Sequence, residues 1–390
     1  MGRICIPDSE YQERIQKAAK LVRERGLDAM LVVSTESDYA NARYFSGFWP
    51  LFERAGVLIG ASGKAVLLVG PESTVFAKDF GKIDKVMVLR EFRESADPAY
   101  PELVPDTFKD AFNYVGATGE NLKIGLGSYV ECTLPIVDGL KETFPKAQLI
   151  VCNDIMVELR SIKSANEIAC MKEGFRIIEV ATDEVIKALK PGVTELQMVG
   201  VAQKVIYEQG AEYEGLPMYV FSESSTRHAI SRSTYKVIGK NDIVQLNLSA
   251  KIDGYSPAIG LPVFMGKAEG EKKEIVEFCL KMHDWTTENL KAGIKADVVP
   301  KQFLQMFKDA GYEKNYVYGP CHGTGMIEVE APWMETSSDY ILKPNMTFQI
   351  DTFVSGSTFG CRWEKGCAIT EDGIDSYTDY LKKGLVELNF

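Results

Sequence analysis

Clustered positive charge is missing from this sequence, and its absence restricts the partners that the protein can bind. The chain has 44 Lys and Arg residues against 55 Asp and Glu residues, and its formal net charge at pH 7 is −11. It contains no long run of Lys or Arg, whereas phosphate backbones are bound through local positive charge. We therefore expect no nucleic-acid partner. A small anionic substrate is still compatible with this composition, because one buried Arg can bind a carboxylate.

Long apolar runs and paired cysteines are missing as well. No apolar stretch approaches the roughly 20 residues that span a bilayer, and the opening MGRICIPDSEY has no apolar signal core. The eight cysteines are scattered along the chain without a CxxC pair, at a density far below that of a disulfide-stapled protein. We expect free thiols, a cytoplasmic location and no membrane partner.

The remaining composition is that of a globular protein, with 45% hydrophobic and 25% charged residues. A length of 390 residues suggests two or three domains. In the first ~150 residues, short β-rich runs such as 29–33 alternate with helical stretches such as 11–24, which predicts an α/β domain. The polar segment 153–164 is the expected join. It gives an N-terminal domain of residues 1–154 and a C-terminal domain of residues 155–390.

The second half of the chain combines helix-start signals with β-rich runs. Two capping boxes, Ser164 with Glu167 and Thr194 with Gln197, predict the beginnings of two helices. Strands are then predicted from β-rich runs bounded by Gly-containing turns, at 243–249, 262–265, 346–353 and 360–369. This part of the chain is therefore predicted to be α+β, with helices packed on an antiparallel sheet.

The chain has only three histidines, and two of them are candidates for catalysis. His228 and His322 lie in turn-like, polar or Gly-rich segments, whereas His283 lies in a predicted helix. An unperturbed His titrates near neutral pH, so His228 and His322 are candidate general acids or bases. The alternative is that each is a surface or hydrogen-bonding residue. His283 is expected to be structural.

Two late carboxylates interrupt otherwise apolar strands. Asp351 lies in MTFQIDTF, and Glu364 lies in GCRWEK. Burying a carboxylate is costly unless it is paired or coordinates a ligand, so both are candidate site residues. The alternative is a structural ion pair, for instance with Arg362.

The order of several motifs resembles that of the superfamily of creatinase, aminopeptidase P, prolidase and methionine aminopeptidase. The resemblance covers nearly the whole chain and rests on the segments RYFSGF at 43–48, VELRSIKS at 157–164, DGY at 253–255, HGTG at 322–325 and TEDG at 370–373. It implies a creatinase-type N-terminal domain over 1–154 and a catalytic domain of the pita-bread fold over 155–390.

The resemblance also shows where this chain departs from the metallopeptidases of that superfamily. Their five metal-binding side chains fall here on Asn247, Ala258, His322, Asp351 and Glu364. Two carboxylates are lost, so we expect no two-metal centre and assign neither metal nor cofactor. The three ligand types that remain leave open whether one ion binds.

Creatinase has the same two departures, and the resemblance to it implies roles for four further residues. His228 matches its catalytic His. Phe52 and Arg54 match a segment that reaches into the neighbouring subunit's site and binds the substrate carboxylate, so a homodimer is implied. Tyr255 is assigned to substrate binding. The positions of other creatinase site residues hold Ser256, Gly260 and Val329, so the substrate is not expected to be creatine itself.

The hypothesis that follows is a metal-independent hydrolase of a C–N bond in a small, carboxylate-bearing guanidino, amidino or amide compound. His228 would serve as general acid and base, His322 would orient the reacting centre, and Asp351 and Glu364 would bind an N–H-rich group. Two alternatives stay open. One is an Xaa-Pro metallopeptidase with a degenerate metal site, and the other is a non-catalytic pseudopeptidase that binds a protein partner.

Overall fold

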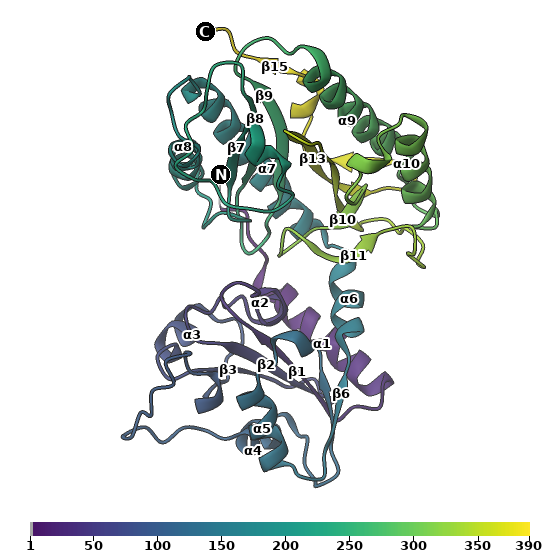
Figure 1. Ribbon diagram of the computed structural model, residues 1–390. Coiled ribbons are helices and arrows are strands. Elements are labelled where there is room, and N and C mark those ends of the chain that lie inside the picture. The colour runs from purple at the N-terminus through teal and green to yellow at the C-terminus, as the bar shows by residue number, and fades with distance from the viewer. Residues whose placement is uncertain (1–2) are drawn as a thin grey trace. The chain divides into compact units, whose positions relative to one another are not determined.

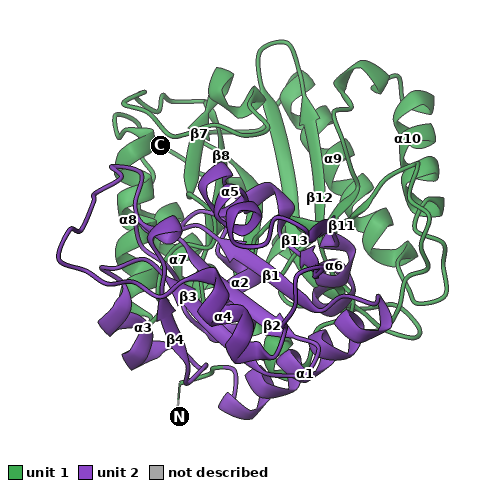
Figure 2. Cartoon of the chain, turned by 90° about the horizontal axis from the view of Figure 1, so that it is seen from below, with its two compact units in different colours: residues 1–5, 161–390 green, residues 6–160 purple. Residues whose placement is uncertain are grey.

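The computed structural model describes residues 3–390, which form two compact units. One unit comprises residues 6–160 and the other comprises residues 161–390 together with the described residues before Ile6 (Figure 2). The boundary predicted after residue 154 lies inside helix α6 (Asn153–Ser161), which leads from the first unit into the second. No helix within residues 3–390 is long and apolar enough to cross a membrane.

The N-terminal unit is an α/β domain built on one six-stranded sheet. The strand order is β4-β3-β2-β1-β5-β6. Its strands are β1 (Ala29–Ser34), β2 (Ala55–Gly60), β3 (Ala65–Val69), β4 (Val86–Val88), β5 (Lys123–Leu126) and β6 (Gln148–Val151). Its other helices are α1 (Asp8–Glu24), α2 (Ala40–Ser46), α3 (Thr74–Phe80), α4 (Phe108–Val115) and α5 (Leu134–Thr143). Every residue of β1 is buried, because its continuous apolar run is covered on both faces.

The C-terminal unit is an α+β domain with a larger, mainly antiparallel sheet. The strand order is β11-β10-β12-β13-β9-β8-β7, with β14 beside β13 and β15 beside β9. Its strands are β7 (Tyr219–Ser222), β8 (Ile243–Ser249), β9 (Ala258–Phe264), β10 (Cys321–Gly323), β11 (Glu330–Met334), β12 (Thr347–Ser355), β13 (Gly360–Ile369), β14 (Ile374–Ser376) and β15 (Val386–Glu387). This two-domain architecture confirms the predicted fold class.

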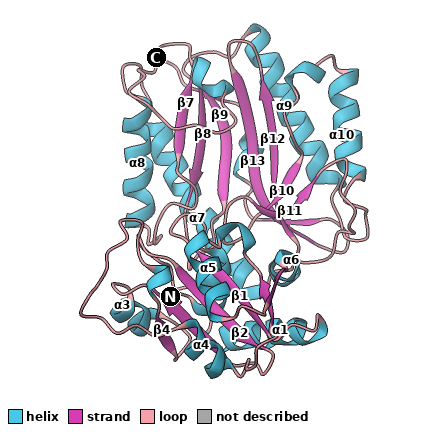
Figure 3. Ribbon diagram, turned by 60° about the horizontal axis from the view of Figure 1, so that its bottom comes forward, coloured by secondary structure: helices cyan, strands magenta, loops and turns pink. Residues whose placement is uncertain are grey.

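Four helices flank this sheet, and each of the two predicted capping boxes lies at the beginning of a different helix. The helices are α7 (Ala165–Ala188), α8 (Glu195–Glu208), α9 (Gly270–Asn289) and α10 (Val298–Asp309). Ser164 and Glu167 cap α7 reciprocally, and Thr194 and Gln197 do the same for α8. Helix α8 lies beside β7 and α7 lies beside β8 and β9, whereas α9 lies beside β12 and β13 (Figure 3). Helix α10 packs on α9 (Figure 1).

The strand register brings widely separated residues to neighbouring positions at the centre of the sheet. Asp351 on β12 pairs with Glu364 on β13, and Glu364 pairs in turn with Gly260 on β9. Gly260 also pairs with Asn247 on β8. On the other flank, His322 on β10 pairs with Gln349 on β12. These strands therefore converge on one group of polar side chains.

A glycine is required at position 260 for this convergence. A Cβ atom there would lie 2.9 Å from Cβ of Glu364 and 3.1 Å from Cγ and Cδ of Arg362. Both side chains pass over Gly260 in the space that a larger residue would occupy. The glycine at position 260 thus makes room for Arg362.

Candidate catalytic pocket

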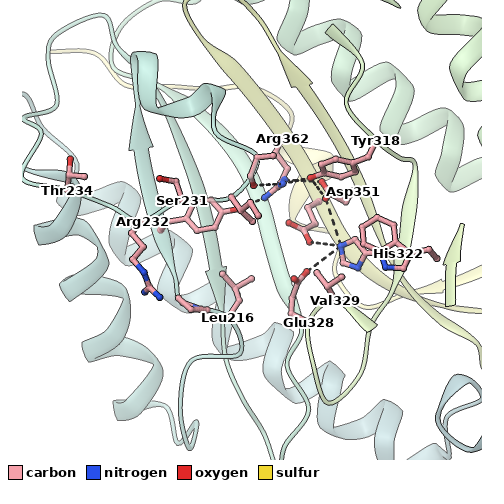
Figure 4. A pocket seen from close by; sticks show the side chains of 16 residues that line it. Leu216, Ser231, Arg232, Thr234, Tyr318, His322, Glu328, Val329, Asp351 and Arg362 are labelled. Carbon is pink, nitrogen blue, oxygen red and sulfur yellow. Dashed lines mark hydrogen bonds and ion pairs between the residues drawn. The ribbon is translucent and has the colours of Figure 1, made fainter. Parts of the chain in front are cut away.

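A pocket of about 930 Å³ lies at this group of polar side chains on the C-terminal sheet (Figure 4). We call one part of its lining the acidic end, which consists of His322, Glu328, Asp351 and Glu364. We call another part the apolar wall, which consists of Leu216, Pro217, Ile230, Val329 and Trp333. The acidic end is largely buried, whereas Ile230, Val329 and Trp333 in the wall are exposed. The pocket therefore has a buried part lined by charged side chains and a more exposed part lined by apolar side chains.

His322 is held with one ring nitrogen facing the carboxylates. Its Nδ1 lies 3.0 Å from the carbonyl oxygen of Gly323, and only the nitrogen of such a pair can donate. The lone pair of the neutral ring is then on Nε2. This atom lies 3.6 Å from Oε1 of Glu328 and 3.9 Å from both Oδ2 of Asp351 and Oε1 of Glu364. None of these three distances is a hydrogen bond.

Glu328 is the site residue that the sequence did not reveal. It follows the HGTG motif in the irregular segment between β10 and β11, where no strand or helix period predicts the direction of a side chain. Ser256 fixes this segment, since its backbone N–H donates to Gly325 and its hydroxyl donates to Met326, at 2.8 Å each. Glu328 is thereby directed at His322. The only sequence feature that could have indicated Glu328 is its position six residues after His322.

The carboxyl groups of Glu328 and Glu364 are perturbed by their surroundings. Burial raises the pKa of Glu328, and the negative charge of Asp351 adds to this effect. Burial, followed by the charges of Glu328 and Asp351, raises the pKa of Glu364 well above its ordinary value. The two groups hence favour a proton or a cation between them.

Asp351 is paired with Arg362 rather than left free. Nε of Arg362 lies 3.0 Å from Oδ1 of Asp351, and the hydroxyl of Tyr318 donates to Oδ2 at 2.7 Å. Arg362 also donates to the hydroxyls of Tyr219 and Tyr318, and at 2.9 Å to the carbonyl of Ala229. The ion pair considered from the sequence is thus present, and it holds Asp351 in the pocket lining.

The two positions that depart from the metallopeptidase pattern contribute no negative charge. Nδ2 of Asn247 donates to Oε2 of Glu364 at 2.9 Å, which turns the other oxygen of Glu364 toward His322. Ala258 contributes only its carbonyl, which accepts from Gln349 at 2.8 Å. A centre of two divalent ions does not fit this donor set, because two of the five expected ligands are absent and Asp351 is committed to Arg362.

A single divalent cation does fit. One ligand atom each from His322, Glu328 and Glu364 lie within 4.8 Å of one another. Ligand atoms about 2.1 Å from one tetrahedral ion would be about 3.4 Å apart, close to the 3.6 Å that separates His322 from Glu328. When Glu328, Asp351 and Glu364 are ionised, their three negative charges exceed the single positive charge of Arg362 by two. This excess matches the charge of one divalent ion.

The structure does not bring all predicted site residues to the pocket. His228 is exposed in the loop after β7, and its neighbour Ala229 lines the pocket in its place. Tyr255 is buried and donates to Glu167 at 2.6 Å, so its hydroxyl is engaged with helix α7. His322, Asp351 and Glu364, by contrast, all line the pocket.

Phe52 and Arg54 belong to the N-terminal unit. Phe52 is 73% exposed, and Nη1 of Arg54 donates to the carbonyl of Arg93 at 3.1 Å. Their proposed role in a neighbouring subunit's site stays a prediction. His283 is buried as a structural residue, and Nδ1 donates to the carbonyl of Trp363 at 3.1 Å.

Comparison with known proteins adds family information to this geometry. The model of metallopeptidase family M24 matches residues 169–371, and that of the creatinase/prolidase N-terminal domain matches residues 14–162. An uncharacterized peptidase of Bacillus subtilis is 25% identical over 96% of this chain and 99% of its own. An Xaa-Pro dipeptidase of Pyrococcus furiosus is 24% identical over 94% and 98%, and a creatinase of a Bacillus species is 23% identical over 95% and 91%.

Solved structures show the same fold. The X-Pro aminopeptidase of Thermotoga maritima superposes with a TM-score of 0.83 at 22% identity, over 96% of this chain and 99% of that chain. The prolidase of Pyrococcus horikoshii gives a TM-score of 0.80 at 21% identity, over 94% and 98%.

Proposed function

Because the chain belongs to metallopeptidase family M24, we propose that it is a hydrolase of the amide C–N bond in short, peptide-like substrates. The observation that carries this proposal is the convergence of His322, Glu328 and Glu364 in a pocket large enough for a dipeptide. The names of several relatives, Xaa-Pro dipeptidase among them, support a peptide bond as the target. The metal-independent reaction predicted from the sequence is less well supported.

His322, Glu328 and Glu364 would hold one divalent cation. Such an ion supplies Lewis acidity toward a carbonyl oxygen and lowers the pKa of water. The carbonyl of Gly323 orients His322, and the amide of Asn247 orients Glu364, as outer contacts do in metal sites. Gly323 and Asn247 therefore keep the donor atoms of His322 and Glu364 directed at one point.

Arg362 and Tyr318 form a fixed polar group beside these donors. Arg362 is held by Asp351, and both Arg362 and Glu364 line the pocket. A guanidinium in a largely buried site stabilises negative charge that develops on a substrate oxygen. Asp351 thus acts through Arg362, as a positioning residue.

Metal content measured together with activity tests this function. We expect about one equivalent of Zn, Mn or Fe per chain, turnover of Xaa-Pro dipeptides, and loss of both after EDTA treatment. His322→Ala should abolish turnover and metal retention together. Two equivalents per chain, or full activity of thoroughly metal-free protein, would contradict the single-ion proposal.

A second candidate is the creatinase-like, metal-independent hydrolase of a guanidino or amidino acid. It is favoured by Asn247 and Ala258, which remove two carboxylates from the site. In this reading His228 is the general acid and base, and Phe52 and Arg54 act across a homodimer. His228→Ala should then abolish turnover of guanidino acids. Survival of that turnover, or a monomer by light scattering, would remove this candidate.

A further inference from the structure

The pocket lining contains two arginines, and their surroundings differ. Arg362 is engaged by Asp351, two tyrosine hydroxyls and the carbonyl of Ala229. Arg232 is exposed and makes no hydrogen bond or ion pair with any residue in the described range 3–390. Figure 4 shows Arg232 and His322 at opposite sides of the pocket. The donor-rich guanidinium of Arg232 is thus available to a ligand.

The loop that carries Arg232 is fixed on both sides of it. Before it, the carbonyl of Ala229 accepts from Arg362 at 2.9 Å. After it, the hydroxyl of Ser233 accepts from the backbone N–H of Val220 at 2.8 Å and donates to its carbonyl at 2.9 Å.

The next residue strengthens this anchor. The backbone N–H and hydroxyl of Thr234 both donate to Oε2 of the fully buried Glu195, at 3.0 and 3.1 Å. Arg232 therefore extends from a short, pinned segment at the pocket, which lowers the entropy cost of holding it against a ligand.

We propose that Arg232 is a specificity-determining residue that binds the free carboxylate of the substrate. An anionic group is attracted by Arg232. The acidic end repels such a group when it holds no metal, and it carries no net positive charge when one divalent ion is bound, so the substrate is oriented with its carboxylate away from His322. The planar guanidinium can bind a carboxylate through two hydrogen bonds. Leu216 of the apolar wall lies between Arg232 and Glu328 in Figure 4, so this part of the pocket fits an apolar side chain or ring.

The substrate class that follows is a short, apolar, peptide-like molecule with one free carboxylate. This inference rests on the proposed function for the statement that the bound molecule is hydrolysed. The binding statement stands separately, because it concerns the carboxylate and not the scissile bond.

The test compares leucyl-proline with its C-terminal amide on the full-length protein. Turnover is measured on metal-loaded enzyme, and binding is measured by calorimetry on EDTA-treated enzyme. Arg232→Gln should raise KM and Kd for leucyl-proline about 10- to 100-fold, with little change in kcat and no change for the amide. Arg232→Lys should recover part of the loss. Arg227→Gln, an exposed neighbour outside the pocket lining, should behave as wild type.

Each outcome separates the two proposals. Equal loss for acid and amide, or no loss for either, would overturn the role of Arg232 while leaving hydrolysis intact. Selective loss of acid binding in a protein that turns over no peptide would support Arg232 and reject the proposed function. Equal binding of acid and amide by the wild-type protein would also overturn the inference.

Discussion

The amide of Asn247 donates a hydrogen bond of 2.9 Å to the carboxylate of Glu364. An Asn at this point is compatible with an ionised Glu364, because it supplies an N–H group where a second carboxylate would repel. The contact therefore links the loss of one metal-binding carboxylate to the orientation of another that remains. It explains how a reduced set of ligands can still be held in order.

We expect Asn247→Asp to destabilise the metal-free protein by about 1–3 kcal/mol, since it exchanges a buried donor for a further carboxylate beside Glu364. A divalent cation should recover more stability in the variant than in the wild type, because it offsets the added charge. Thermal unfolding with EDTA and with excess Mn²⁺ or Zn²⁺ measures both effects. Asn113→Asp, at an exposed site of the N-terminal unit, is the control. An unchanged melting temperature in EDTA would count against this view of the site.

The variant Glu328→Gln should have opposite effects on the metal-free and metal-loaded protein. It removes a buried carboxyl whose ionisation is unfavourable, so the melting temperature in EDTA at pH 7.5 should rise. It also removes one proposed ligand, so the rise in melting temperature on adding metal should shrink, and affinity should fall at least tenfold. Glu371→Gln, an exposed carboxylate, should change neither quantity. A full metal-induced shift in Glu328→Gln would exclude Glu328 as a ligand.

Much of the fold could be predicted because its signals are local. The capping boxes at Ser164 and Thr194 fixed the beginnings of α7 and α8, and the β-rich runs marked β8, β12 and β13. Family spacing then placed His322, Asp351 and Glu364 on neighbouring strands, which the register shows.

The rest of the site depends on segments that carry no periodic signal. Glu328 is directed by an irregular turn that Ser256 holds from a distant part of the chain. The partners of Arg362, Tyr219 and Tyr318, come from two further segments. Side-chain direction in loops follows from such long-range contacts, so the position of His228 outside the pocket lining could not be read from its motif either.

His283 should make stability depend on pH in the acidic range. Burial, with the charge of Lys365, lowers the pKa of His283 from 6.5 to about 3. Between these values the unfolded chain binds a proton that the folded chain does not. The free energy of unfolding should therefore fall as pH drops below 6.5, by at most about 1.4 kcal/mol per pH unit from this group.

The variant His283→Asn tests this dependence, because its amide can still donate toward the carbonyl of Trp363. Denaturant titrations between pH 4 and 8 should show a shallower loss of stability on acidification than in the wild type. The raised pKa values of Glu328 and Glu364 act in the opposite direction, since those groups favour the folded state at low pH. Glu328 and Glu364 are present in both the wild type and His283→Asn, so the difference between their two stability curves reports the contribution of His283. Parallel curves would show that folding does not lower the pKa of His283.

Arg362 and Asp351 should behave as a coupled pair. Both are buried, and their side chains are joined by the 3.0 Å contact and by shared hydrogen bonds to Tyr318. Arg362→Met alone would leave the carboxylate of Asp351 buried without its cation, at a cost of about 3–5 kcal/mol. Arg362→Met combined with Asp351→Asn should cost less than Arg362→Met alone, because the unpaired charge is gone. Urea denaturation of the two single variants and the double variant gives the coupling energy. Strict additivity would mean that Asp351 does not hold Arg362, and the positioning role assigned to Asp351 would then be lost.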